Sequence, residues 1–132
     1  MTHTNLIERL EKAEGADSLL DQEIAKSFGW TYPHKDRVGN VVWKTHTGAL
    51  HYSSHPPTYT HSIDAALSLV ERALPRCSIE IHGFPGRGKW NCDLNLLDGK
   101  FLINEDAEIY TSHKSPAIAI LIALLKAVEA ND

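Results

Sequence analysis

The chain lacks the features that mark disulfide-rich, repetitive or low-complexity proteins. It has only two cysteines, Cys77 and Cys92, and both lie in segments where apolar and polar residues alternate. This pattern predicts small core residues rather than a disulfide framework. The sequence has no internal repeat and no low-complexity tract. We therefore expect a single domain over residues 1–132, in a reducing cytoplasm.

Long hydrophobic runs and excess positive charge are also missing. The longest apolar run, residues 116–125, is about half of the roughly 20 residues that span a bilayer. The first residues do not have the basic and apolar pattern of a signal peptide, so neither export by that route nor membrane insertion is expected. The formal net charge of -4 disfavours general binding to a phosphate backbone.

The composition is that of a compact globular protein. Hydrophobic residues make up 42% and charged residues 23% of the 132 residues. Both values are near globular averages, so disorder and fibrous structure are not indicated. A chain of this length buries roughly two thirds of its unfolded surface, which is enough to fold without disulfides or metals.

Hydrophobic periodicity predicts two helices near the start of the chain. Residues 5–14 have one apolar face and end at Gly15, and a second helix follows from Asp17 or Ser18 to Gly29. The polar stretch 32–40 is typical of a loop. The other expected elements are strands at 41–45 and 49–52, a helix at 63–74, strands at 77–82, 90–96, 100–103 and 107–111, and a helix from 116 to 125.

The order ααββαβββα predicts an α+β fold, with helices packed on a mostly antiparallel sheet. The last helix is apolar nearly all round and should be deeply buried. The sheet carries a polar set that needs water, a polar helix face or a ligand beside it. That set is Glu80, His82, Asn91, Asp93 and Asn95.

Residues 57–70, PTYTHSIDAALSLV, carry a family signature. It is accompanied by Gly15, Leu20-Asp21, Ile24-Ala25 and Gly29-Trp30 upstream, and by residues 115–119 downstream. With these motifs the chain resembles the phage ABA-sandwich domain, a family of small phage and prophage proteins without a settled function. The resemblance implies a three-layer α-β-α sandwich with helices on both faces of the sheet. Residues 83–106 contribute little to it.

The glycine-rich segment 83–89, GFPGRGK, satisfies the first seven positions of a phosphate loop. Trp90 stands where the metal-binding Ser or Thr belongs, and an alternating strand follows instead of a helix. Two readings stay open. The segment is a plain hairpin loop, or it is a loop in which Arg87 and Lys89 contact an anion beside the ring of Trp90.

Histidines and aromatic residues gather in the first half of the chain. His46, His51, His55 and His61 are solvated loop residues, metal ligands or ligand contacts, and their spacing does not choose among these. The rings of five aromatic residues either fill the core or line a cleft that stacks on a base: Trp30, Tyr32, Trp43, Tyr52 and Tyr59.

The signature residues Tyr59, Thr60, Ser62 and Asp64 have two interpretations. Ser62 can cap the helix that follows while Tyr59 fixes the entering chain, which makes the segment a loop anchor. In the other interpretation Tyr59, Thr60 and His61 border a pocket beside the helix N-terminus. No Ser or Cys has a base arranged beside it as an activated nucleophile would, so an enzyme is not expected.

The resemblance implies a phage or prophage accessory protein in the host cytoplasm, and aromatic and histidine-rich loops without a catalytic set favour a non-catalytic one, without a cofactor or metal. It would bind a small anionic ligand, such as a nucleotide immune signal, or a host protein, and a homo-oligomer would suit such a pocket. Three alternatives stay open: an RNA- or DNA-binding module with an αβββα core, a small metal-dependent hydrolase, and a packaging helper that acts by protein contacts. The expected ligand-binding residues are Trp43, His46, His51, Tyr52, Tyr59, Thr60, Arg87, Lys89 and Trp90.

Overall fold

The computed structural model describes residues 3–53, 55–98, 101–102 and 108–131. The helices are α1 (Thr4–Lys12), α2 (Ser18–Ser27), α3 (Ile63–Ala73) and α4 (Pro116–Asn131). The strands are β1 (Thr31–Lys35), β2 (Val41–Lys44), β3 (Leu50–His51), β4 (Cys77–Phe84), β5 (Lys89–Asp98), β6 (Phe101–Leu102) and β7 (Glu108–His113). The α+β class and the antiparallel pairing are confirmed. The expected order ααββαβββα is found with two more short strands, β1 before β2 and β6 between β5 and β7.

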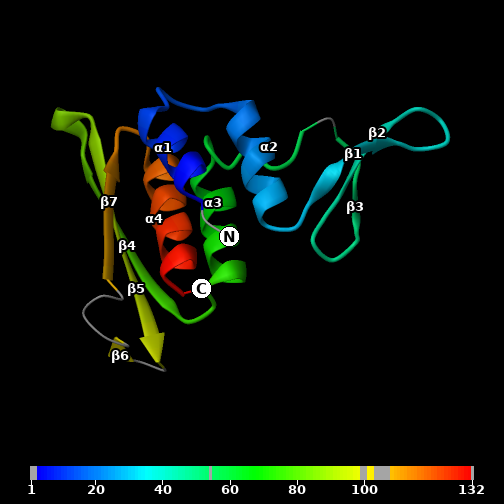
Figure 1. Ribbon diagram of the computed structural model, residues 1–132. Helices are drawn as coiled ribbons and strands as arrows, with labels where there is room; N and C mark the ends of the chain where they lie inside the picture. Colours follow the sequence, from blue (N-terminus) through cyan, green and yellow to red (C-terminus); the bar gives the residue numbers. More distant parts are fainter. Residues whose placement is uncertain (1–2, 54, 99–100, 103–107, 132) are drawn as a thin grey trace.

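Helix α4 is apolar on all sides because it lies in the middle of the molecule. It packs on β5 and β7 on one side and on α1 and α3 on the other (Figure 1). All of residues 117–125 are buried. Its start is fixed by Ser115, whose Oγ accepts a hydrogen bond from the amide of Ile118 at 3.3 Å. The expectation of a deeply buried last helix is confirmed.

The larger sheet has the order β4-β5-β7, and β6 pairs with the end of β5. The pairing of β4 with β5 runs without a break from Cys77↔Leu96 to Phe84↔Lys89. The turn between them contains the short 3-10 helix Pro85–Arg87 and leads into a strand. Residues 83–89 therefore form a hairpin loop and have no helix after them to hold a phosphate.

The side of this sheet away from α4 is polar. Glu80 and His82 are exposed there, and Asn91, Asp93 and Asn95 are half-buried. In Figure 1 the helices lie together on one side of β4-β5-β7, and none of the described helices covers the other. The molecule therefore has its helices between two sheets, whereas the resemblance implies helices on both faces of one sheet. On this face His82 Nε2 lies 3.3 Å from Glu80 Oε2 and Asn95 Nδ2 lies 3.5 Å from Asp93 Oδ1, whereas the buried Oδ1 of Asn91 has no hydrogen-bond partner among the described residues.

The smaller sheet, β1-β2-β3, projects from the helices (Figure 1). The expectation of a loop over residues 32–40 is wrong in its first part, because β1 occupies Thr31–Lys35. Pairing with β2 overrides the polar composition there, with a register shift between Thr31 and His34. The rest of the stretch is a turn in which Asp36 accepts hydrogen bonds from the amides of Val38 and Asn40, each at 2.9 Å.

Several smaller expectations are settled by the same description. Cys92 is buried and Cys77 half-buried, and both are free thiols. None of the described helices is both long and apolar enough to cross a membrane. Residues 99–100 and 103–107 lie outside the described residues, and with them parts of the expected strands 100–103 and 107–111.

Candidate functional site

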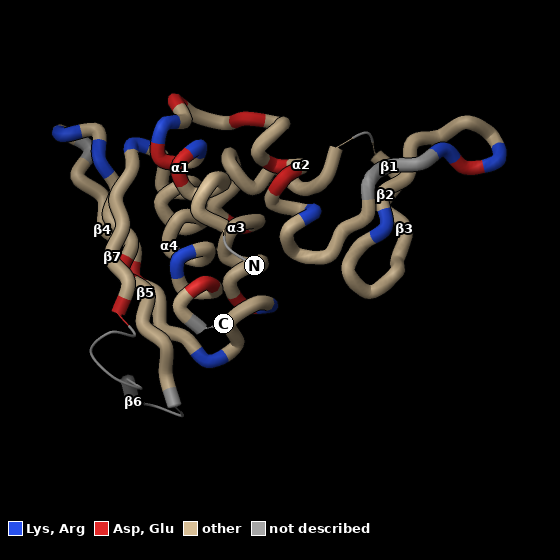
Figure 2. The backbone as a smooth tube through the Cα atoms, viewed as in Figure 1, with Lys and Arg blue, Asp and Glu red and all other residues tan. Residues whose placement is uncertain are grey.

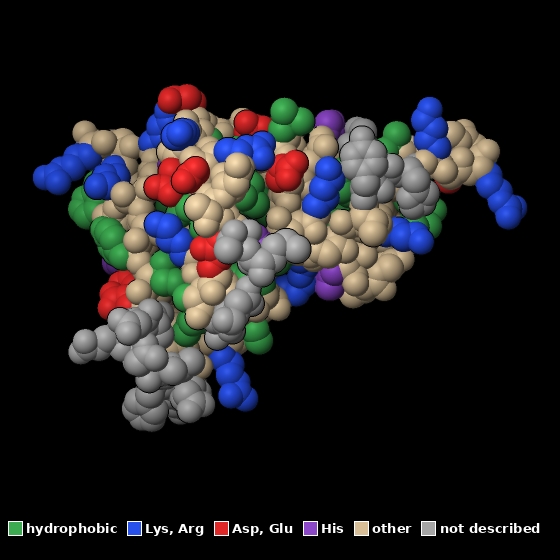
Figure 3. Space-filling model, viewed as in Figure 1, with side chains coloured by type: hydrophobic (Ala, Val, Ile, Leu, Met, Phe, Trp, Pro, Cys, Tyr) green, Lys and Arg blue, Asp and Glu red, His purple; other side chains and the backbone are tan. Residues whose placement is uncertain are grey.

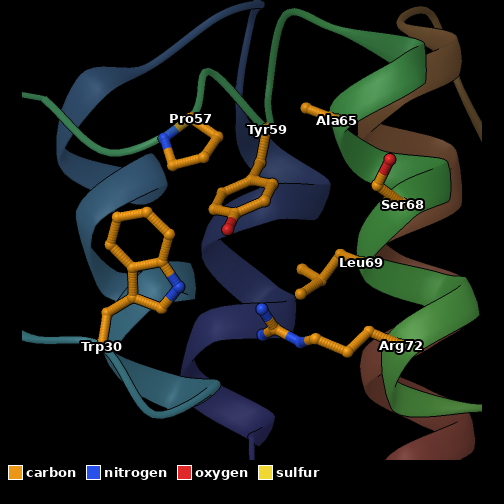
Figure 4. Close-up of a pocket in the computed structure, with 7 residues that line it drawn as sticks. All are labelled: Trp30, Pro57, Tyr59, Ala65, Ser68, Leu69 and Arg72. Atoms are coloured by element: carbon orange, nitrogen blue, oxygen red, sulfur yellow. The ribbon is translucent and has the colours of Figure 1, made fainter. Parts of the chain in front are cut away.

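A cavity of about 340 Å³ lies between the end of α2, the loop before α3 and the face of α3 (Figure 4). We call it the Arg72 cavity. Its lining combines apolar walls with an indole, a phenol and a guanidinium. The lining residues are Trp30, Pro57, Tyr59, Ala65, Ser68, Leu69 and Arg72.

Trp30 enters the cavity wall directly after α2. The preceding residue, Gly29, has φ of 94°, which turns the chain sharply at the helix end. The Trp30 ring then packs edge-on against Trp43 at 6.3 Å and against His51 at 5.2 Å between ring centroids. Only 8% of Trp30 is exposed, and its Nε1 has no hydrogen-bond partner among the described residues. Figure 4 shows this nitrogen directed into the cavity.

Tyr59 is held in place by a buried network behind it. The neighbouring Thr60 donates from its backbone amide, at 2.7 Å, and from its hydroxyl, at 2.8 Å, to Oδ1 of Asp21. The Thr60 hydroxyl also accepts a hydrogen bond from the amide of Asp17 at 2.8 Å. Ser62 caps α3, accepting from the amide of Ala65 at 3.1 Å. The signature residues Thr60 and Ser62 are therefore a loop anchor that joins α2 to α3.

The hydroxyl of Tyr59 points into the cavity (Figure 4), although only 4% of the residue is exposed. Burial raises the pKa of Tyr59 above its ordinary value of 10.0, and the positive charge of Arg72 opposes this shift. The phenol therefore stays protonated at neutral pH and can donate a hydrogen bond.

Arg72 reaches from α3 across the opening of the cavity. Its Nη1 lies 2.9 Å from Nδ1 of His46, and its Nη2 donates to the carbonyl oxygen of Phe28 at 3.2 Å. These two contacts orient the guanidinium towards Trp30 and Tyr59 (Figure 4). An arginine has five N–H donors, so others stay available to a ligand.

The structure gathers some of the predicted ligand-binding residues here and disperses the others. Tyr59 lines the Arg72 cavity, and His46 and His51 support its Arg72 and Trp30. Trp43 is fully buried behind Trp30. Tyr52 is exposed beside a different depression, of about 500 Å³, on the β1-β2-β3 sheet.

Arg87, Lys89 and Trp90 belong to the β4–β5 hairpin, at the opposite end of the molecule from β1-β2-β3 (Figure 2). Trp90 lies over Gly83, where an added Cβ would meet the indole ring at 2.5 Å. The glycine-rich loop and the aromatic half of the chain therefore do not form one site.

Of the seven residues that line the cavity, only Tyr59 belongs to the sequence-based set, and Trp30 and Arg72 are the most consequential of those outside it. Trp30 was grouped with the aromatic residues but not with the ligand contacts. The sequence does contain a signal for Arg72, because its spacing places it on one helical face with Ala65, Ser68 and Leu69. The sequence could indicate that face, but it could not indicate that α2 and Trp30 lie opposite it.

Nucleophilic and metal-binding groups are sparse around this site. Burial raises the pKa of Cys92 to about 12, and it also raises the pKa of Cys77. Neither thiol has the depressed pKa of a reactive cysteine. Within the described residues, no three His, Cys, Asp or Glu side chains converge as metal ligands would. Glu80 and His82 do meet, at 3.3 Å, but on the exposed face of the larger sheet.

No family model, curated protein or solved structure matches the chain.

Proposed function

We propose that the protein is a non-catalytic binding protein whose Arg72 cavity holds a small anionic ligand with an apolar part. The observation that carries this proposal is the unpartnered Nε1 of Trp30, a residue that is only 8% exposed. A buried polar group without a partner costs about 1–3 kcal/mol. An acceptor atom on a ligand would remove that cost.

The other polar groups of the cavity suit the same acceptor. Tyr59 offers a neutral hydroxyl and Arg72 a positive charge, and both face the space into which the Trp30 nitrogen points (Figure 4). A carboxylate or phosphate oxygen is the chemistry that three such donors recognise. The apolar walls, formed by Pro57, Ala65 and Leu69, suit a ring or a short aliphatic group.

The charge of the cavity limits the ligand to one anionic group. Arg72 is the only cation among the residues that line it. A volume of about 340 Å³ is at the small end of ligand pockets, which span about 300–1,000 Å³. We therefore favour a monocarboxylate or a phosphate monoester, including a nucleoside monophosphate, over a di- or triphosphate.

The resemblance to the phage ABA-sandwich domain gives this binding a biological context. A phage or prophage accessory protein of this kind would sequester a small nucleotide immune signal in the host cytoplasm. Nucleic-acid binding receives less support. In Figure 3, the Lys and Arg side chains on the visible face are spread among acidic ones rather than gathered in one basic patch.

Calorimetric titration of the whole chain tests the proposal. The probes are cyclic and linear nucleoside monophosphates, benzoate and inorganic phosphate. We expect saturable binding of at least one probe that carries both an anion and an apolar group. Hydrogen bonds to charged groups contribute about 1.5–3 kcal/mol, so Arg72→Ala should weaken that binding by about tenfold or more.

Trp30→Phe is the second variant, because it keeps an aromatic ring while it removes the Nε1–H group together with part of the indole. It should weaken binding of the same probe while the far-end double variant Arg87→Ala/Lys89→Ala leaves the affinity unchanged. If no probe binds, or if Arg72→Ala binds as tightly as the wild type, the Arg72 cavity is not the site.

A further inference from the structure

The longest edge strand in the described part of the chain is open along its full length. β4 has 8 residues and pairs with β5 on one side only. Helix α4 packs on β5 and β7 instead. An open edge presents a row of backbone N–H and C=O groups to any strand that can pair with it.

β4 has few of the devices that usually protect such an edge, and Glu80 is its one acidic or basic side chain besides His82. It contains no Pro and no Lys, and its register with β5 has no bulge. The other sheet is different, since β1 contains Pro33 and has a shifted register, and β3 has only 2 residues. The edge strands of the smaller sheet therefore have features that disfavour pairing with a further strand, and β4 lacks these features.

The apolar side chains of β4 are also only partly covered by the helices. On the helix side, Cys77, Ile79 and Ile81 are only half-buried. Their partners on β5, Leu96, Leu94 and Cys92, are buried beneath α4. Apolar surface thus continues past the last helix to the open edge, where a further strand would cover it.

The strand is complementary to itself. Its exposed face carries Glu80 and His82, with His82 Nε2 at 3.3 Å from Glu80 Oε2. We propose that β4 pairs antiparallel with β4 of a second copy, about a two-fold axis at Ile81. This register sets Glu80 of each copy opposite His82 of the other, and it joins the two Ile81 side chains on the helix side. A register centred on Glu80 would instead set two carboxylates directly opposite each other.

Sedimentation equilibrium of the full chain over a wide concentration range tests this pairing. We expect a reversible dimer. His82→Glu places four carboxylates around the axis and should weaken the dimer by about tenfold or more. The exchanged double variant Glu80→His/His82→Glu has the wild-type composition and restores the opposite pairs, so it should dimerise like the wild type. Both side chains are more than half exposed, at 58% and 65%, so neither change should affect folding.

Hydrogen exchange identifies the strand involved. In the dimer, the amides of residues 77–84 that do not bond to β5 should be protected, and dilution to monomer should remove the protection. A protein that is monomeric at every concentration overturns the proposal. So does a dimer that His82→Glu leaves intact, since its interface would lie elsewhere. The outcome is independent of ligand binding in the Arg72 cavity, which β4 does not line.

Discussion

Asp21 is a carboxyl group buried at the junction of α2 and the loop before α3, with 5% of the residue exposed. It accepts two hydrogen bonds from Thr60, and Thr60 also bonds to the backbone of Asp17. The residues Asp21 and Thr60 belong to the motifs on which the resemblance to the phage family rests. Their arrangement shows that these motif positions fix the loop that presents Tyr59, so they act on the Arg72 cavity from behind.

We expect Asp21→Asn to change how stability depends on pH. Burial raises the pKa of Asp21 above its ordinary value of 3.8, and the hydrogen bonds from Thr60 oppose the shift. A raised pKa means that the folded state holds the proton more tightly. This contribution to stability is complete below pH 3.8 and is lost as the pH rises through the folded-state pKa.

The variant has no such proton. The free energy of unfolding of the wild type, minus that of Asp21→Asn, should therefore fall as the pH rises through this window. Denaturant titrations at a series of pH values measure the difference. A difference that grows with pH would show that the hydrogen bonds outweigh burial and that the pKa is lowered in the folded state.

The two cysteines should react very differently with thiol reagents. Cys92 is fully buried, and its pKa is raised to about 12, so almost no thiolate forms at neutral pH. Cys77 is half-buried, and its pKa is also raised. We expect a maleimide to label Cys77 slowly and Cys92 only after unfolding. Mass spectrometry of the Cys77→Ser variant supplies the control, and rapid labelling of that variant in the folded state would contradict the burial of Cys92.

At the scale of helices and strands, the sequence predicts the start of an element where that start depends on residues within the element or next to it. The capping residues Asp17 and Ser62 start α2 and α3 as expected, because each side chain binds amides only two or three positions away. β1 was missed because its strand conformation depends on pairing with β2 rather than on its own composition. Arg72 was missed because its importance comes from contacts with His46 and Phe28, both distant in sequence.

Helix α4 should be the element most sensitive to truncation of its side chains. Leu121 is 1% exposed and lies among other buried residues, so Leu121→Ala removes core contacts and leaves a cavity. Such changes cost about 2–5 kcal/mol. The matched control is Leu19→Ala on α2, where the side chain is 64% exposed and the change should stay within about 0.5 kcal/mol. Equal losses of unfolding free energy in the two variants would show that α4 is not the centre of the core.

At the scale of the whole molecule, two bodies meet around the Arg72 cavity. The loop before α3 supplies Tyr59 and α3 supplies Arg72, while β2, β3 and the turn between them supply Trp43, His51 and His46 as supports. Trp30 stands at the point where the chain passes from one body to the other. The sequence could indicate each body, but their relative placement depends on side-chain contacts between segments far apart in the chain. The cavity, which this placement creates, was therefore beyond sequence reasoning.

Gly29 is the residue that sets this placement. Its φ is 94°, and a Cβ added there would lie 3.1 Å from the Cβ of His46. Gly48 has a similar φ of 87°, but nothing lies within 4 Å of its added Cβ. A left-handed backbone conformation costs a residue with a Cβ about 1–2 kcal/mol. Gly48→Ala should show this backbone cost alone.

We expect Gly29→Ala to lose more stability than Gly48→Ala, because it also pushes His46 away and with it the contact to Arg72. Denaturant titration followed by tryptophan fluorescence measures both effects, since Trp30 and Trp43 lie at the joint between the two bodies. The shift in Gly29→Ala should include a change in the native-state emission that Gly48→Ala does not show. Equal losses and unchanged emission in both variants would mean that the approach of Gly29 to His46 does not hold the two bodies together.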